Sequence, residues 1–258
     1  MTLRRRAASA DKRVRRANSS LDALAAQLRK KPTRKRGASL ESVARALRDG
    51  PKPTAAERAA MARTSESPLD IALPARPISV ELVAGRAHYE RVIAAILAAH
   101  TSVWIATANV KGLMVEGPRR SRKRSNYVSV ISLLDGLAAT GVELRLLHAE
   151  LPSGPFREEL AQHPKLVAGG LALARCPRVH MKAVIVDGAL LYLGSANWTG
   201  AGLGAKGSGK RNFELGIVTD DAQLLDQVQS MFERIWSGGE CAGCKLREVC
   251  PGPLDEQP

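Results

Sequence analysis

The chain has 258 residues, of which 45% are hydrophobic and 3% aromatic, and it carries a net charge of +14 at pH 7. This length suits one full-sized α/β domain with a smaller appendage. The charged N-terminus and the lack of any apolar run approaching the roughly 18 residues of a membrane-spanning helix argue against a secretory leader or a membrane protein. We therefore expect a cytoplasmic location.

The positive charge is concentrated in the N-terminal quarter, where residues 1–70 hold 18 Lys and Arg against 7 Asp and Glu. A concentrated basic segment favours a polyanionic partner, either nucleic acid or an anionic membrane surface. We interpret residues 1–77 as a basic, partly helical N-terminal extension that ends in a proline-rich linker. Apolar spacing within it predicts short helices near residues 21–28, 40–47 and 54–63.

Strands and helices alternate from residue 78 to residue 236, which predicts an α/β fold with a mixed β-sheet flanked by helices on both faces. The predicted strands are 80–83, 103–108, 142–147, 171–174, 179–186, 190–193 and one from Glu214 to Thr219. The predicted helices are 86–99, 128–139, 155–163 and 221–236. Residues 237–258 are predicted to form a short Cys-containing tail.

A basic run interrupts the predicted domain between strand 103–108 and helix 128–139. Five of its six positions are cationic, namely Arg119, Arg120, Arg122, Lys123 and Arg124. Such a loop beside a catalytic sheet can follow a phosphate backbone, so we predict that it binds nucleic acid. A merely solvated charged loop is the alternative.

The most informative stretch runs from His180 to Asn197, HMKAVIVDGALLYLGSAN. It contains two short apolar runs separated by Asp-Gly, which predicts two strands joined by a turn. Alternation along the first strand places His180 and Lys182 on one face, and the second strand ends in Gly-Ser-Ala-Asn. The resulting imidazole, ammonium, hydroxyl and carboxamide suit a phosphate diester, which needs a cation and neutral donors to hold its oxygens and a nucleophile active near pH 7.

These residues resemble the phospholipase D superfamily, whose motif is H-x-K, four residues, D, six residues and G-S-x-N. The match holds at every position: His180, Lys182, Asp187, Gly194, Ser195 and Asn197. The resemblance implies a metal-independent, two-step displacement in which His180 becomes phosphorylated and a second histidine protonates the leaving oxygen. It also implies that Lys182, Ser195 and Asn197 hold the phosphate oxygens. Asp187, in the turn, suits an orienting role better than contact with substrate.

Glu214 opens the next predicted strand and matches the acid that hydrogen-bonds the nucleophile in this family, although a solvated acid at a strand edge is the alternative. The motif occurs only once in the chain. Because the implied chemistry needs two histidines on one phosphate, we predict a symmetric homodimer in which two copies of His180 face each other.

Residues 204–210, GAKGSGK, nearly match a phosphate-binding P-loop. The required Ser or Thr is replaced by Arg211, and a strand rather than a helix follows, so we reject that interpretation. We predict a flap instead, with Lys206, Lys210 and Arg211 within reach of nucleic acid.

Three of the four cysteines cluster near the C-terminus as Cys241, Cys244 and Cys250, and Cys176 precedes the catalytic strand. Clustered thiols in a cytoplasmic chain favour metal binding over disulfides. The spacing resembles the C-terminal cysteines of iron–sulfur nucleases and is equally compatible with zinc. We predict a structural zinc or iron–sulfur cluster held by these four residues, with free thiols or a disulfide as the alternative.

The sequence thus favours a homodimeric, metal-independent nuclease. One alternative keeps the chemistry and changes the substrate, as a phospholipase or phosphatidyltransferase acting on lipid headgroups. The other is a non-catalytic nucleic-acid-binding protein.

Overall fold

The computed structural model describes residues 68–116 and 127–257 of the chain. The helices predicted near residues 21–28, 40–47 and 54–63, and the basic run at 119–124, lie outside these residues. Within the described part, no helix is both long and apolar enough to cross a bilayer.

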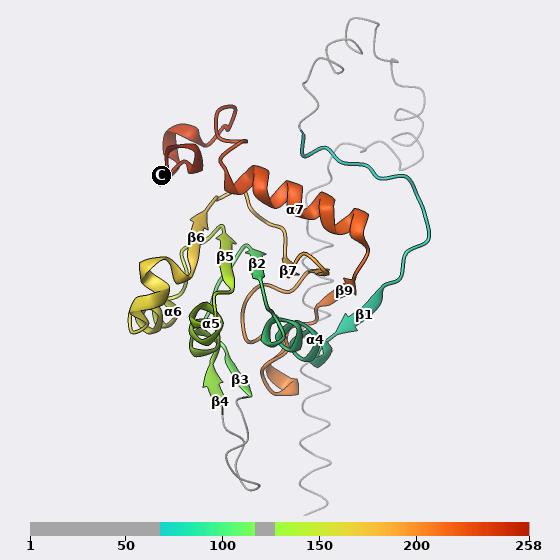
Figure 1. The fold of residues 1–258 in the computed structure, drawn as a ribbon, viewed down its shortest axis with the longest axis vertical. Helices are drawn as coiled ribbons and strands as arrows, with labels where there is room; N and C mark the ends of the chain where they lie inside the picture. The colour runs from blue at the N-terminus through green and yellow to red at the C-terminus, as the bar shows by residue number, and fades with distance from the viewer. Residues whose placement is uncertain (1–67, 117–126, 258) are drawn as a thin grey trace, which may run out of the picture. The chain divides into compact units, whose positions relative to one another are not determined.

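The centre of the domain is a seven-stranded sheet in which both parallel and antiparallel pairs occur (Figure 1). The strand order is β1 (Glu81–Ala84), β9 (Leu215–Thr219), β8 (Leu190–Gly194), β7 (Ala183–Val186), β2 (Ser102–Thr107), β5 (Glu143–His148) and β6 (Ala172–Arg175). Strands β2, β5 and β6 are parallel, whereas every other pair is antiparallel. The predicted mixed sheet is therefore confirmed.

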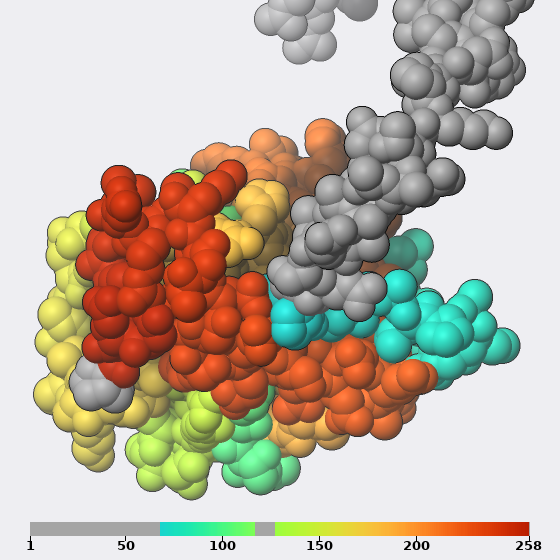
Figure 2. All heavy atoms as spheres, turned by 90° about the horizontal axis from the view of Figure 1, so that it is seen from above, coloured from blue at the N-terminus to red at the C-terminus, as the bar shows by residue number. Residues whose placement is uncertain are grey.

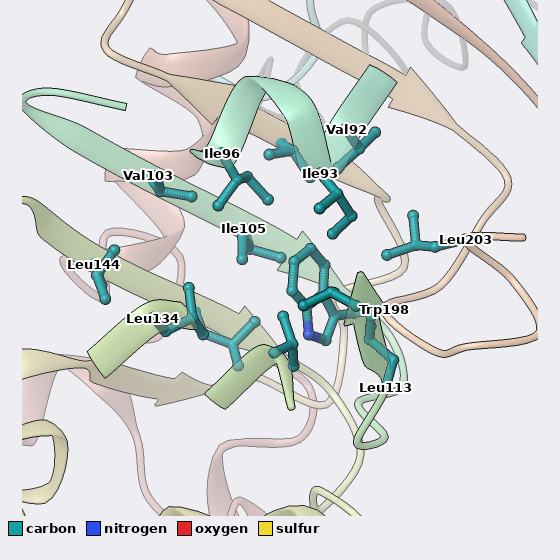
Figure 3. Packing of buried hydrophobic residues seen from close by; sticks show 14 of the residues in the cluster. Val92, Ile93, Ile96, Val103, Ile105, Leu113, Leu134, Leu144, Trp198 and Leu203 are labelled. Carbon is teal, nitrogen blue, oxygen red and sulfur yellow. The ribbon is translucent and has the colours of Figure 1, made fainter. Parts of the chain in front are cut away.

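Helices cover both faces of this sheet, but unequally. Side chains of α4 (Arg86–Leu97), α5 (Val130–Ala139) and α6 (Gly154–Leu160) pack on one face, and those of α7 (Ala222–Trp236) pack on the other. Figure 3 shows how α4, α5, β2 and β5 bring aliphatic side chains together around the indole of Trp198. Burial of these apolar groups is the main favourable contribution to the fold.

The structure differs from the predicted elements at two places. Strand β7 begins at Ala183 rather than at residue 179, so His180 and Lys182 lie in an extended segment just before it. A two-stranded sheet of β3 (Met114–Glu116) and β4 (Tyr127–Ser129) was not predicted, because three residues are too few for an alternating pattern. This hairpin carries the basic run between its two strands.

The C-terminal tail lies beside α7 on the surface seen in Figure 2. Leu254 is buried in the same cluster as Phe232 of α7, and Arg234 of α7 pairs with Glu240 at 2.5 Å. The tail is therefore packed on the domain. Four short helical turns complete the described chain: η1 (Leu166–Gly170), η2 (Ser208–Lys210), η3 (Arg247–Val249) and η4 (Leu254–Glu256).

The turn between β7 and β8 is fixed by Asp187. Both turn residues, Asp187 and Gly188, have positive φ values, 54° and 60°, a conformation that glycine and aspartate tolerate best. The carboxylate of Asp187 accepts hydrogen bonds from the backbone N–H groups of His100, Thr101 and Ser102. The hydroxyl of Thr101 also donates to it, at 2.9 Å. Asp187 thus fastens the turn to the segment that enters β2, which agrees with the orienting role predicted for it.

Burial by itself would raise the pKa of the Asp187 carboxyl, but the hydrogen bonds from Ser102, Thr101 and His100 outweigh it and lower the pKa from 3.8 to about 2. Because the pKa is depressed in the folded state, the carboxylate adds stability above pH 4, and this contribution is lost as the pH falls towards 2. We expect Asp187→Asn to lower the free energy of unfolding by about 1–2 kcal/mol at pH 7, with allowance for partial solvent exposure.

Urea titrations near pH 7 and near pH 2.5 check this expectation, because the difference in stability between the wild type and the variant should narrow at the lower pH. Asp220→Asn is the matched control, since Asp220 is an exposed carboxylate in the same domain. A stability gap that is the same at both pH values would contradict the role assigned to the charge.

Candidate active site at the end of β7 and β8

The motif residues meet at one end of the sheet because β7 and β8 are antiparallel neighbours. His180 and Lys182 immediately precede β7, and Ser195 and Asn197 immediately follow β8. The backbone N–H of Gly194 donates to the carbonyl of Lys182 at 3.1 Å, which continues the ladder beyond the first residue of β7. The start of one strand and the end of the other therefore form a single surface.

Lys182 lies against the imidazole of His180, as the alternation of side chains predicted. Its Nζ is 3.0 Å from Nδ1 and 3.2 Å from Nε2 of His180, and it donates to the carbonyl of the same residue at 2.6 Å. A neutral imidazole has one ring nitrogen with a lone pair in the ring plane and one that carries a hydrogen. The ammonium can donate only to the lone-pair nitrogen, and it must release that nitrogen before the nitrogen can bond to phosphorus. Lys182 is 8% exposed, whereas His180 is exposed to solvent.

The electrostatic environment of Lys182 has two opposing contributions. Burial lowers the pKa of its ammonium, and the negative charge of Glu214 acts in the opposite direction, with a net lowering. A partly desolvated cation has few water partners to lose when a phosphate oxygen arrives. Lys182 is therefore well placed to bind an anion beside the His180 ring.

The contacts of Glu214 differ from the predicted ones. The Ser195 hydroxyl donates a short hydrogen bond to Glu214, and the Asn212 amide donates to it at 3.1 Å. No hydrogen bond joins Glu214 to His180, both of which the structure describes, so the predicted contact is absent here. The reason is the register of β8 with β9, which places Glu214 directly beside the Ser195 turn while the His180 ring faces Lys182.

Asn197 is held by residues that the sequence analysis missed. Its Oδ1 accepts hydrogen bonds from the Thr107 hydroxyl and the Asn109 backbone, both at 3.2 Å. The Thr107 hydroxyl also accepts from the N–H of Trp198 at 3.0 Å, and Trp198 is buried in the core. Because Oδ1 is used to position the side chain, the amide nitrogen of Asn197 is the group left to donate to a ligand. Thr107 lies about ninety residues before Asn197, so no local pattern predicts this contact. The only signal in the sequence is the polar residue at the end of β2.

The buried side chain of Tyr192 packs against the Gly-Ser-Ala-Asn turn. The Tyr192 hydroxyl lies 3.0 Å from Nδ1 of the fully buried His88 and accepts a hydrogen bond from the backbone of Ala196. Burial raises the pKa of Tyr192 to about 12, so the hydroxyl stays protonated. A Cβ on Gly194 would lie 2.8 Å from the ring of Tyr192 and equally close to the Leu215 carbonyl, which explains the glycine in the motif.

His148 ends β5 opposite Thr107 and is also buried. Burial lowers its pKa, and its Nδ1 lies 2.9 Å from the Glu150 carbonyl. This arrangement keeps the His148 ring neutral near pH 7. His148 therefore lies, uncharged, at the same end of the sheet as His180.

The structure does not show the predicted zinc or iron–sulfur site, which stays a prediction. All four cysteines, Cys176, Cys241, Cys244 and Cys250, are described and are free thiols. No group of three or more metal-ligating side chains gathers anywhere in residues 68–116 and 127–257. Burial raises the pKa of Cys176, with smaller contributions from Cys241 and Cys244, so these thiols are near one another. Cys176 and Cys241 also pack against the cluster of Phe232 and Leu254, which joins the tail to the domain.

The predicted nucleic-acid contacts fall into two groups. Lys206 and Lys210 are exposed, and the guanidinium of Arg211 donates to the Lys206 carbonyl at 2.5 Å, so this cationic segment folds back on itself. It leads directly to Asn212 and Glu214 and therefore adjoins the site. Outside the described residues lie Arg119, Arg120, Arg122, Lys123 and Arg124.

A mixed sheet that presents an imidazole, an ammonium, a hydroxyl and an amide at one end is typical of a domain that binds a phosphate ester. Residues 92–236, more than half of the chain, match the family model described as "Cardiolipin synthase, PLD-like domain". The chain therefore belongs to the phospholipase D superfamily, and the family predicted from the motif is confirmed.

Known relatives are distant. The chain is 26% identical over 160 residues to the mitochondrial cardiolipin hydrolase of Danio rerio, covering 62% of this chain and 61% of that protein. It thus spans about three fifths of that relative's length. Among solved structures, NucT from Helicobacter pylori is 16% identical with a TM-score of 0.44, covering 61% of this chain and 95% of that one. For the phospholipase D family member Nuc from Salmonella typhimurium the identity is 18%, the TM-score 0.43 and the coverage 62% and 95%.

Gly194→Ala tests the packing beneath the site. We expect it to lower the free energy of unfolding by about 1–3 kcal/mol, because the added methyl group would collide with Tyr192 and with the Leu215 backbone. Gly207→Ala is the control, since a Cβ at that position meets open space. Thermal or urea unfolding of both variants provides the measurement, and equal stabilities would contradict the close packing described here.

Proposed function

We propose that the protein is a nuclease, a phosphodiesterase that cleaves nucleic acid through a phosphohistidine at His180. The observation that carries the proposal is the contact between His180 and the partly desolvated Lys182, 3.0 Å apart, beside Ser195 and Asn197. Membership of the phospholipase D superfamily supports the same chemistry.

In the first step, Lys182 turns to the phosphate and releases the unprotonated ring nitrogen of His180, which attacks phosphorus. The phosphorus–oxygen bond to the leaving group breaks, and a second imidazole, in its protonated form, donates a proton to the departing oxygen. Lys182 compensates the charge on the non-bridging oxygens. The hydroxyl of Ser195 and the amide nitrogen of Asn197 supply neutral donors once substrate displaces their present partners. In the second step, the other imidazole takes a proton from water, the water oxygen attacks phosphorus, and the bond to His180 breaks.

Glu214 acts on this site through Ser195 and through its charge. By accepting the Ser195 hydrogen bond it fixes the hydroxyl oxygen, and its charge opposes the fall in the pKa of Lys182. The residues assigned to catalysis contain a cation of their own, so we propose that activity needs no added metal.

We propose that the second imidazole comes from His180 of a second copy of the chain. The motif occurs once in the sequence, and the His180 ring is exposed rather than enclosed by its own domain. An exposed nucleophile on a two-fold axis would meet its own symmetry mate across a bound phosphate.

Nucleic acid is the substrate that the charges favour. The exposed lysines of residues 206–210 adjoin the site, and the basic run at 119–124 joins β3 to β4 in the same domain. Cationic groups beside a phosphodiester site suit a polymer with a phosphate on each side of the one being cleaved.

A phospholipase or phosphatidyltransferase is the second candidate, favoured by the description of the family model and by the relative named a cardiolipin hydrolase. Basic surfaces also attract anionic lipid headgroups, so charge alone does not separate the two substrates. A nucleic-acid-binding protein without activity is a weaker third candidate, because every motif residue is retained.

A substrate panel tests the function. Wild type and His180→Ala are incubated with single-stranded DNA, duplex DNA, RNA and cardiolipin vesicles in excess EDTA. We expect cleavage of nucleic acid by the wild type and a rate at least about a thousandfold lower in the variant, because the nucleophile is removed.

His100→Ala is the matched control, since His100 is an exposed histidine beside the Asp187 turn, at the other end of β7. Turnover of vesicles alone would establish the lipid enzyme, and binding without turnover would establish the inactive binder.

Mixing subunits tests the paired histidines. We expect an excess of His180→Ala chains to suppress wild-type activity once subunits exchange, because a mixed dimer holds only one of the two imidazoles. Excess His100→Ala chains should not suppress it. Sedimentation under assay conditions gives the size of the active species, and an active monomer would remove the shared site.

A further inference from the structure

Phe213 is an aromatic side chain that the fold leaves entirely in solvent. Its relative exposure is 107%, whereas Phe156 and Phe232, the other two phenylalanines of the chain, are both 0% exposed. Leaving a whole phenyl ring in water forgoes the favourable burial that the other two rings obtain. We therefore expect the Phe213 ring to be covered by a binding partner outside the domain.

Phe213 is adjacent in the chain to residues of the active site. Phe213 lies between Asn212 and Glu214, whose side chains hydrogen-bond each other at 3.1 Å, and Glu214 accepts from the Ser195 hydroxyl. The backbone N–H of the next residue, Leu215, donates to the Ser195 hydroxyl at 3.1 Å. A ligand held by Ser195 would thus lie beside Glu214, the direct neighbour of Phe213 in the chain.

The backbone that carries Phe213 is fixed on both sides. The N–H of Asn212 donates to the Ala201 carbonyl at 3.1 Å, and β9 begins at Leu215. The ring is therefore presented from an anchored segment, so little ordering of the chain is needed when a partner packs on it.

The charges nearby select the partner. Lys206, Lys210 and Arg211 precede Phe213 in the same segment, and both lysines are exposed. A polyanion neutralises these cations, and an exposed aromatic ring in a cationic segment next to a phosphate site is typical of single-stranded nucleic-acid binding.

We propose that Phe213 is a stacking platform for the base next to the cleaved phosphate, and that the substrate is therefore single-stranded nucleic acid. A base offers an open face to the ring only when it is unpaired and unstacked from its neighbours, because both faces of a base in a duplex are covered. This inference rests on the proposed nuclease function and adds the strand form of its substrate.

End-labelled single-stranded oligonucleotides in which one base is replaced by a tetrahydrofuran abasic unit test the proposal. Wild type should cut the linkage beside the abasic unit about tenfold more slowly than the same linkage beside a base, because one stacked base is lost. Phe213→Ala should cut normal linkages about tenfold more slowly than wild type and should no longer distinguish the abasic one.

Three variants separate stacking from other roles. Phe213→Trp and Phe213→Tyr should keep most of the activity on single strands, whereas Phe213→Leu, apolar but without a π face, should behave like Phe213→Ala. Because the ring is exposed, none of these variants should change the melting temperature. Phe213→Ala should also lose part of the wild-type preference for single strands over duplex.

The possible outcomes are distinct. Cleavage of nucleic acid by wild type with no effect of the abasic unit, or full activity in Phe213→Leu, removes the stacking role and leaves the nuclease function intact. Dissociation of Phe213→Ala into monomers would assign the ring to a subunit interface and overturn the proposal. Failure of the wild type to cleave any nucleic acid would remove the proposed function and this inference together.

Discussion

The hydrogen bond from the Gly194 N–H to the Lys182 carbonyl joins the two halves of the catalytic motif. It belongs to the antiparallel ladder of β7 with β8, which pairs Ala183 with Leu193. Because side chains alternate along a strand, a slip of one residue would turn Lys182 to the opposite face of the sheet. The chemistry of the site therefore depends on one register, and much of the surrounding structure serves to hold it.

The hairpin of β7 and β8 is anchored to the rest of the domain at both of its ends. At the turn, the Asp187 carboxylate is bound to the backbone that enters β2. At the other end, Trp198 is buried in the core immediately after Asn197, and Thr107 ties both residues to the end of β2. The reactive groups can therefore be exposed, as His180 and Ser195 are, while the backbone beneath them is anchored.

The sequence predicted the parts of the site that are local. The spacing from His180 to Asn197 contains the two strands, their Asp-Gly turn and the glycine that Tyr192 requires, so the hairpin followed from the pattern. Contacts that join distant segments were not accessible in this way. Thr107 is one example, and the preference of Glu214 for Ser195 is set by the pairing of β8 with β9, which no local pattern contains. Spacing along the chain likewise does not determine whether thiols converge in space, so the metal site at the cysteines stays a prediction.

The tail completes the face of the sheet that α7 covers. Leu254, near the end of the chain, lies in the cluster of Phe232, which is stacked between Trp104 of β2 and Trp236. A version of the protein shortened after α7 would lack Leu254 and would expose part of these rings to water. Leu254, which belongs to no motif, is thus part of the interior, and trimming the tail for crystallisation would expose apolar surface and invite aggregation.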